Sequence, residues 1–272
     1  MKNLFLSQLK PVLKLCYKNK AVFLASVMLD IIFFFVLMFA NYFTLTAMQE
    51  HITKFADLVQ AGMLELAASN TTQGISPAMF KTPEIMAVYH QVLKYLLMLV
   101  IIALVSWIVF KGINWYLANK LIRKVDVKEF ARKFTLHTLL AFVFFAIINL
   151  LMLRMIAYST FEFLPLIGAS GSRILAFILI LVLAYFVFIS YSLVPKTNCK
   201  KLTRFAIKNY KMILPAHLLV SFALVFLAYL TVYIIRFNYY APFIFALLVF
   251  FPAMTYGRIY IVVVVNKVLK RG

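Results

Sequence analysis

Six long apolar stretches constrain this chain more than any other feature of its sequence. Uninterrupted runs such as IIFFFVLMFA (31–40) lack the alternation that a barrel strand would show. A hydrocarbon core of roughly 30 Å needs about 20 helical residues, and a helix satisfies its own backbone hydrogen bonds there. The sequence therefore predicts an all-α polytopic membrane protein, a single membrane domain (1–272) with six transmembrane helices. We place them at about 21–46, 90–112, 137–159, 173–194, 213–236 and 241–265.

Composition agrees with this class of protein. Hydrophobic residues make up 65% of the 272 residues and charged residues only 13%. A soluble domain is nearer half apolar, with about a quarter of its residues charged. The apolar excess is therefore expected to face lipid.

The formal net charge of +20 is distributed unevenly along the chain. Five cations precede the first span, seven lie between Lys111 and Lys133, six follow span four, and three close the sequence. A six-span threading puts all of these clusters on one side, which is the positive-inside pattern. We therefore expect a multi-pass protein of the cell membrane with both termini cytoplasmic. Orientation accounts for the charge and no nucleic-acid motif accompanies it, so no nucleic-acid partner is expected.

The segment KKLTRFAIKNYK (200–211) has a spacing typical of an amphipathic helix. Its cations step by three and four residues, whereas Leu202, Ala206 and Tyr210 lie on the opposite side. Such a helix is suited to the headgroup region, with its basic face outward and its apolar face in the acyl boundary. The stripe consists of Lys201, Arg204, Lys208 and Lys211.

The same design precedes spans one and three. Before span one, Lys10, Lys14 and Lys18 line up against an apolar face formed by Leu9, Val12, Leu13 and Cys16. Before span three, the segment 125–138 carries Arg132 and Lys133, and its apolar face consists of Val127, Phe130, Ala131, Phe134 and Thr138.

These three segments suggest an internal repeat. Lys18, Lys133 and Lys208 are separated by 115 and 75 residues, and the excess matches the long connection 48–88 between spans one and two. The chain is therefore predicted to contain three units, each a basic interfacial helix followed by a two-helix hairpin. The alternative is that any cytoplasmic loop entering a membrane tends to be basic and amphipathic.

The connection 48–88 is external on this threading. Apolar residues at helical spacing between Ile52 and Leu66 predict an amphipathic helix, which would cap the bundle or lie on the outer leaflet. Asn70-Thr71-Thr72 matches the glycosylation sequon. Thr82-Pro83-Glu84 is a favourable start for the helix that enters span two.

The residues that carry most enzyme chemistry are sparse. The two cysteines fall in cytoplasmic segments, where thiols stay reduced. The four histidines lack metal-ligand spacing, and no phosphate-binding glycine loop or nucleophile elbow is present. We expect no catalytic residues, no metal site and no cofactor, and so a protein that is not an enzyme.

Polar residues inside the spans are the remaining candidates for a functional site. Asp30 and Arg258 each lie roughly 12 Å from the cytoplasmic end of their spans, so they can pair if the first and last spans are neighbours. Alternatively, Arg258 snorkels to the surface while Asp30 bonds a backbone group or is protonated. Asn149, near the middle of span three, is the third intramembrane polar candidate.

The segment ISYSLVPKTNCKKLTRFAIKNYKMILPAHLLVSFAL (189–224) shows a span, a polar turn, a short basic helix and another span. This layout resembles the polytopic membrane domain attached to some glycerophosphodiester phosphodiesterases and its stand-alone prokaryotic relatives of unknown function. The small residues and tryptophan usual in that turn are absent here. The resemblance implies a fold of this layout and no catalytic residues.

Two classes of function remain. The first is a non-catalytic membrane protein that acts at the cytoplasmic leaflet through its basic helices, on anionic lipid headgroups or a partner protein. The second is a transporter or channel with a polar site around Asp30 and Arg258. Transport predicts polar residues around a water-accessible cavity, whereas the first class predicts a packed bundle with grooves at the cytoplasmic leaflet. The residues expected to bind anionic lipid are Lys14, Lys18, Arg132, Lys133, Lys201, Arg204, Lys208 and Lys211.

Overall fold

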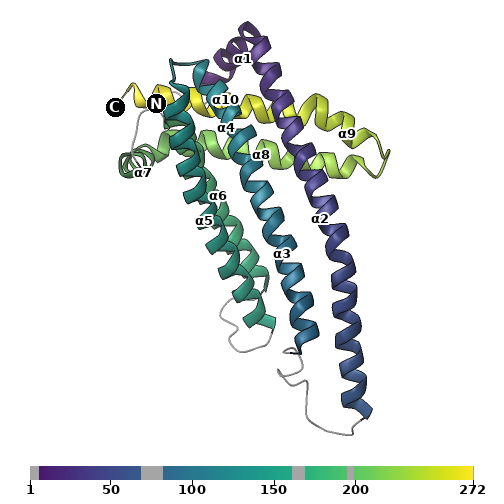
Figure 1. Ribbon diagram of the computed structural model, residues 1–272. Coiled ribbons are helices and arrows are strands. Elements are labelled where there is room, and N and C mark those ends of the chain that lie inside the picture. The colour runs from purple at the N-terminus through teal and green to yellow at the C-terminus, as the bar shows by residue number, and fades with distance from the viewer. Residues whose placement is uncertain (1–5, 69–81, 161–168, 195–198, 272) are drawn as a thin grey trace. The chain divides into compact units, whose positions relative to one another are not determined.

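The computed structural model describes residues 6–68, 82–160, 169–194 and 199–271, a region built of helices (Figure 1). Six of these helices are long and apolar enough to cross a membrane, which confirms the predicted all-α polytopic class. They run over Lys20–Gly62, Pro83–Lys120, Val127–Met152, Ile174–Leu193, Tyr210–Ile234 and Ala241–Leu269.

The chain forms two compact units. Unit 1 contains Met1–Ile31 and Ile108–Gly272, and unit 2 contains Ile32–Trp107. Both boundaries fall within continuous helical segments, so the single domain predicted for 1–272 stays a prediction.

Unit 2 consists of most of α2 (Lys20–Ala68) together with α3 (Pro83–Ser106). The prediction of a separate helix after residue 48 is wrong, because α2 runs through this segment as one helix of 49 residues. No glycine or proline interrupts it before Gly62. A helix of that length measures about 73 Å, more than twice the roughly 30 Å hydrocarbon core, so part of it must project beyond the membrane.

The start of α3 falls where predicted, although the Thr82 side chain makes no capping hydrogen bond. Thr82 has an extended backbone, and Pro83 occupies the first helical turn, where its missing N–H costs nothing. Within unit 2 the ring of His51 stacks on that of Tyr95 at 5.7 Å between centroids. The sequon at Asn70 lies outside the described residues.

Unit 1 is built around α10 (Phe251–Leu269), which is buried almost continuously from Gly257 to Val265. Its packing partners are α1 (Leu9–Lys18), α4 (Gly112–Lys120), α6 (Ala169–Leu193) and α8 (Tyr210–Ile234). The helix α5 (Val127–Thr160) packs along α6, and the short helix α7 (Cys199–Lys208) packs on α6 and α8.

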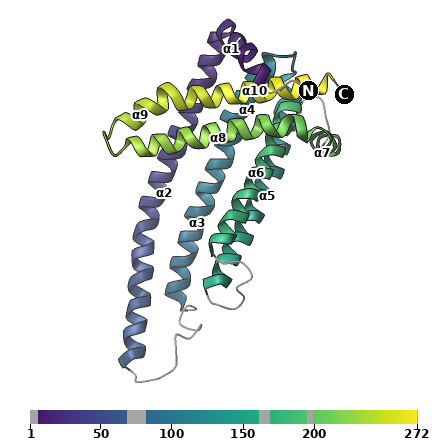
Figure 2. The same ribbon diagram turned by 180° about the vertical axis from the view of Figure 1, so that it is seen from behind.

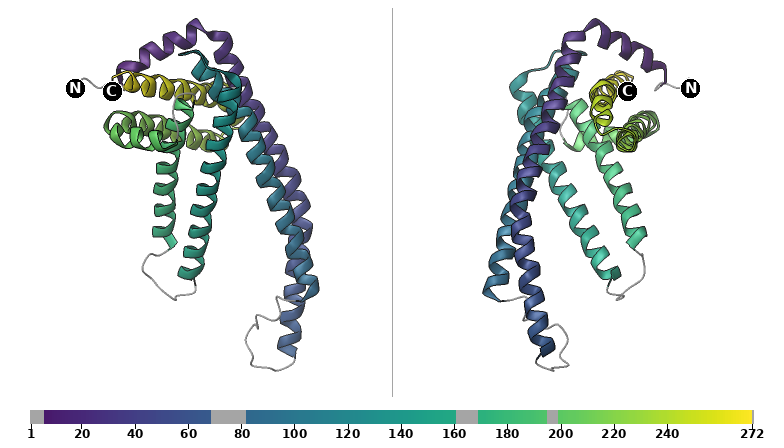
Figure 3. Two further views of the ribbon diagram at one scale, coloured as in Figure 1. Left: turned by 60° about the vertical axis from the view of Figure 1, so that its left-hand side comes forward. Right: turned by 90° about the vertical axis from the view of Figure 1, so that its right-hand side faces the viewer.

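Two hairpins of unit 1 cross each other. The hairpin formed by α8, α9 (Ala241–Phe245) and α10 runs transverse to the hairpin formed by α5 and α6 (Figures 1 and 3). Viewed from behind, α8 and α10 lie side by side (Figure 2). Exposed apolar residues cover α8 from Phe222 to Val232, so this hairpin requires hydrocarbon around it.

Two π-helical segments interrupt the spans. The segment η3 (Trp107–Lys111) joins α3 to α4, and η4 (Ala246–Phe250) precedes α10. Pro252 explains η4, because a proline lacks an N–H and its ring clashes with the carbonyl four residues earlier, here Leu248. A wider turn at that point relieves both problems.

The first and third basic segments form matching helices, α1 and α7. Residues 11–20 and 201–210 have the same sequence of buried, intermediate and exposed positions. Both helices stop at an asparagine whose side chain donates back to the carbonyl four residues earlier, Asn19 to Leu15 and Asn209 to Phe205, each at 3.0 Å. These two copies of the predicted repeat therefore share local structure.

The middle basic segment differs from the other two. The repeat places Phe134 where the outer copies have asparagine, and α5 continues through this position as one helix. Phe130, Phe134 and Thr138 are buried, whereas Val127 and Ala131 on the predicted apolar face are exposed. The prediction of a separate interfacial helix before span three is therefore wrong.

Candidate functional site

A buried polar cluster lies where α2, α4 and α10 meet within unit 1. At its centre is Asp30, whose side chain has no exposed surface. Lys111 donates from Nζ to Oδ1 at 2.7 Å, and Arg258 donates from Nη2 to Oδ1 at 2.8 Å and to Oδ2 at 2.7 Å. Asn114 donates to Oδ1 at 2.8 Å and Thr255 to Oδ2 at 2.9 Å. One carboxylate thus faces two cations and two neutral donors.

A second set of bonds links these donors to each other. Ser26 accepts a hydrogen bond from Arg258 Nη1 at 2.9 Å and donates its own proton to Asn114 Oδ1 at 2.8 Å. Ser26 and Asn114 are both buried. The polar groups of the cluster therefore satisfy one another, as a buried network must if it is not to destabilise the fold.

Helical spacing places these residues. Each of three helical segments contributes two of them one turn apart: Ser26 and Asp30, Lys111 and Asn114, Thr255 and Arg258. The second pair begins at the last residue of η3, and the third pair stands shortly after η4. Because a wider turn changes the register of the helix beyond it, η3 and η4 help to set the direction in which both cations point.

The structure contains the predicted contact between Asp30 and Arg258, and Arg258 is buried rather than snorkelled. Asn149 does not join the cluster, because its side chain donates to the Phe145 carbonyl of its own helix at 2.7 Å. Sequence reasoning missed Lys111, because its position near the end of a span is also typical of a cation that sets orientation. The one-turn spacing of Lys111 and Asn114 was the available signal.

The cluster is closed to solvent, and the side chains of Lys111 and Arg258 are only 5% and 6% exposed. Removing one partner from such a buried ion pair leaves an uncompensated charge, which typically costs about 3–5 kcal/mol. The arrangement is suited to fixing three helices to one another. Among the described residues, no group of three metal-binding side chains is present.

A further cation, the half-buried Arg123, lies just after the second span and joins the ends of three helices. Arg123 donates to Asn266 Oδ1 at 3.3 Å and to the Ser192 carbonyl, and its Nη2 also contacts Asn119 Oδ1. Burial lowers the pKa of Arg123 to about 10. This residue connects the ends of α4, α6 and α10.

The basic helices expose their cations and bury part of their apolar faces. Val12 and Cys16 of α1, and Leu202 and Ala206 of α7, are buried in the protein core. The predicted contact with the acyl boundary is therefore wrong for these residues, which protein covers, whereas Leu13 on the same predicted face of α1 is 63% exposed. The Tyr185 hydroxyl fixes α7 by donating to the Ala206 carbonyl at 2.9 Å.

The predicted lipid-binding cations do not all have the same surroundings. Exposed positions are occupied by Lys14, Lys18, Arg132, Lys201, Arg204, Lys208 and Lys211. Lys133 instead pairs with Glu129 at 2.7 Å and is largely covered. Tyr210, predicted on the apolar face of α7, lies beyond the break at Asn209 and is exposed.

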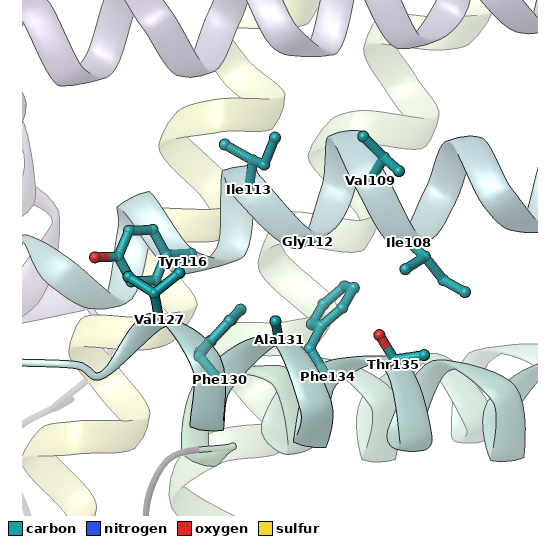
Figure 4. Close-up of a pocket in the computed structure, with 10 residues that line it drawn as sticks. All are labelled: Ile108, Val109, Gly112, Ile113, Tyr116, Val127, Phe130, Ala131, Phe134 and Thr135. Carbon is teal, nitrogen blue, oxygen red and sulfur yellow. The ribbon is translucent and has the colours of Figure 1, made fainter.

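Two cavities of unit 1 have apolar walls. The first, of about 210 Å³, lies between η3, α4 and the start of α5 (Figure 4). Gly112 opens it, since a Cβ there would come within 3.2 Å of the Phe134 ring. The second, of about 390 Å³, lies between α5 and α6 and ends at α7. Neither cavity is lined by Asp30 or Arg258.

Comparisons with protein-family models, curated proteins and solved structures found no match to this chain. The resemblance to the membrane domain of glycerophosphodiester phosphodiesterases stays a prediction. The order of α6, α7 and α8 has the layout on which that resemblance rests.

Proposed function

We propose that this is a non-catalytic integral membrane protein that holds anionic lipid at the cytoplasmic leaflet through the cations of α1 and α7. The observation that carries the proposal is the matching burial of these two helices. Each has buried apolar residues fixed in the protein core, so its cations are presented by a rigid support. Lys14 and Lys18 on α1 correspond to Arg204 and Lys208 on α7.

The charges around these helices support the same proposal. Within the described parts of the chain, none of these four cations lies within ion-pair distance of a carboxylate. Near an anionic leaflet each such cation contributes about 1 kcal/mol, within about a Debye length of the surface. Rigid presentation lowers the entropy that would be lost on binding.

The test measures how much anionic lipid purifies with the protein. A variant with Lys14, Lys18, Arg204 and Lys208 replaced by glutamine is compared with a control that loses four exposed cations elsewhere on the same predicted side, Lys120, Lys124, Lys128 and Lys270. Native mass spectrometry and lipid extraction give the molar ratio of anionic lipid to protein. We expect the ratio to fall in the first variant alone. Equal ratios in the two variants would overturn the proposal.

The second candidate function is transport, with the Asp30 cluster as the site. The observation that favours it is the presence of η3 and η4 beside the cations of the cluster, because π-helical segments are frequent at functional sites. Transport would require the cluster to open to water. Water accessibility of Ser26→Cys, measured with a small thiol reagent in membranes, tests this: rapid labelling favours transport and none favours the lipid-holding function.

A further inference from the structure

The groove between α5 and α6 is graded from apolar to polar along its length. The end of the groove that is farther from α7 is lined by Phe144 and Ile148 of α5 and by Leu179 of α6. Its other end is lined by His137, whose Nδ1 contacts the Ser190 hydroxyl. The apolar part of the groove is open, since Phe144 is 57% exposed, whereas His137 and Ser190 at the polar end are buried.

The polar end of the groove leads to the cations of α7. Thr203 lines the groove and also a neighbouring surface depression formed with Arg204, Ile207 and Lys208. The position of α7 is fixed by the hydrogen bond from Tyr185 to the Ala206 carbonyl. The apolar groove thus ends beside two exposed cations, Arg204 and Lys208, on a helix whose position is fixed.

The length of the groove matches one leaflet. From Leu179 to Ser190 the α6 backbone rises about 16 Å, which is about half of a 30 Å hydrocarbon core. The acyl chain of a phospholipid spans one leaflet, so a chain lying in the groove would place its headgroup beside Arg204 and Lys208.

We infer that this groove binds one anionic phospholipid, with an acyl chain along α5 and α6 and the phosphate at Arg204 and Lys208. The inference rests on the proposed function and gives it a defined site. The cations select a negative headgroup, and the apolar walls make van der Waals contacts along the chain. The site differs from a diffuse basic surface because it requires both parts.

The experiment uses purified protein titrated with phosphatidylglycerol or with phosphatidylcholine of the same acyl chains, followed by native mass spectrometry. One variant removes the headgroup contacts (Arg204→Gln with Lys208→Gln), and its charge-matched control is Lys120→Gln with Lys124→Gln. A second variant fills the groove (Ala141→Phe), and its control is Ala146→Phe on another face of α5. Thermal unfolding checks that each variant is folded.

We expect wild type to bind phosphatidylglycerol saturably and more tightly than phosphatidylcholine. Loss of two cations should weaken phosphatidylglycerol binding roughly thirtyfold and remove the preference. Ala141→Phe should weaken the binding of both lipids, and the two controls should bind as wild type does.

The outcomes separate the two proposals. If the cation variant loses the preference while Ala141→Phe binds normally, the groove is overturned and the proposed function stands. If neither change affects phosphatidylglycerol, both are overturned. A protein subunit seen on wild type and lost on Ala141→Phe, with lipid binding unchanged, would also overturn the inference.

Discussion

Arg258 and Asp30 stand at opposite ends of the sequence, and one guanidinium nitrogen of Arg258 lies within 2.8 Å of both carboxylate oxygens of Asp30. Lys111 holds the same carboxylate from the end of η3, so three spans meet on one acidic side chain. An anion held by two cations stays paired when either cation is lost, whereas each cation depends on Asp30. The contributions of the three residues to stability are therefore unequal.

Asp30→Asn is expected to destabilise the detergent-solubilised protein more than Arg258→Gln does. The first change leaves two buried cations without a counter-ion, for a loss of about 3–5 kcal/mol. The second leaves the pair of Asp30 with Lys111 intact and should cost about 1–3 kcal/mol. Equilibrium unfolding in denaturant measures both.

The double variant tests whether the two residues interact. Because they share hydrogen bonds, its loss should be smaller than the sum of the single losses. Asn149→Leu serves as a control for removing an intramembrane polar group outside the cluster, and it should change stability little. Strict additivity of Asp30→Asn and Arg258→Gln would contradict the network.

The sequence predicted the all-α class and the existence of all six spans, because continuous apolar length is a local property. It also predicted that Asp30 and Arg258 lie at similar depths, since depth follows from counting residues. It did not identify Lys111 as a partner. A lysine near the end of a span can set the orientation of that span or can pair with a buried carboxylate. Only the packing of α4 against α10 decides between these two roles.

The errors in the basic helices have a related cause. Hydrophobic periodicity shows that one face of α1 or α7 is apolar, but lipid and protein cover an apolar face equally well. The break that separates a short helix from its span depended on one residue, Asn19 or Asn209 in the outer copies and Phe134 in the middle one. That difference was visible in the sequence once the repeat was aligned.

Gly257→Ala should destabilise the α8–α10 hairpin. A Cβ at Gly257 would lie 2.8 Å from Cγ1 of Val220, closer than two carbons can approach. Overpacking of this kind typically costs about 1–3 kcal/mol, which thermal unfolding in detergent can resolve. Val220→Ala, combined with Gly257→Ala, removes the clash and should recover part of the loss. No recovery would mean that the glycine matters for another reason.

Cys16 should react slowly with a thiol reagent and should make stability depend on alkaline pH. It is 6% exposed, and burial raises the pKa of its thiol above its usual range. Because the folded state favours the neutral thiol, stability is lost as pH rises past about 8.5, where the unfolded thiol ionises. Cys16→Ala, which copies Ala206 at the matching position of α7, should remove this pH dependence.

The reactivity of Cys16 needs a reference on the same helix. Tyr17→Cys in a background lacking both native cysteines places a thiol at a position that is 85% exposed. Alkylation at pH 8 should be much faster at position 17 than at Cys16. Equal rates would show that α1 does not hold Cys16 against the core.

The tip of the α8–α10 hairpin should be reachable from outside the cell. Tyr233, Phe237, Tyr239 and Tyr240 are exposed there, and Arg236 lies over the Tyr233 ring at 5.5 Å. Such an aromatic group is typical of a membrane–water interface, and the six-span threading puts it on the side opposite to α1 and α7.

In a cysteine-free background, Tyr239→Cys should react with an impermeant thiol reagent in intact cells, and Lys124→Cys only after permeabilisation. Because this hairpin runs transverse to α5 and α6 (Figure 3), labelling at position 239 tests directly whether the hairpin spans the membrane. If Tyr239→Cys reacts only after permeabilisation, the hairpin returns to the cytoplasmic side and the last two helices do not span the membrane.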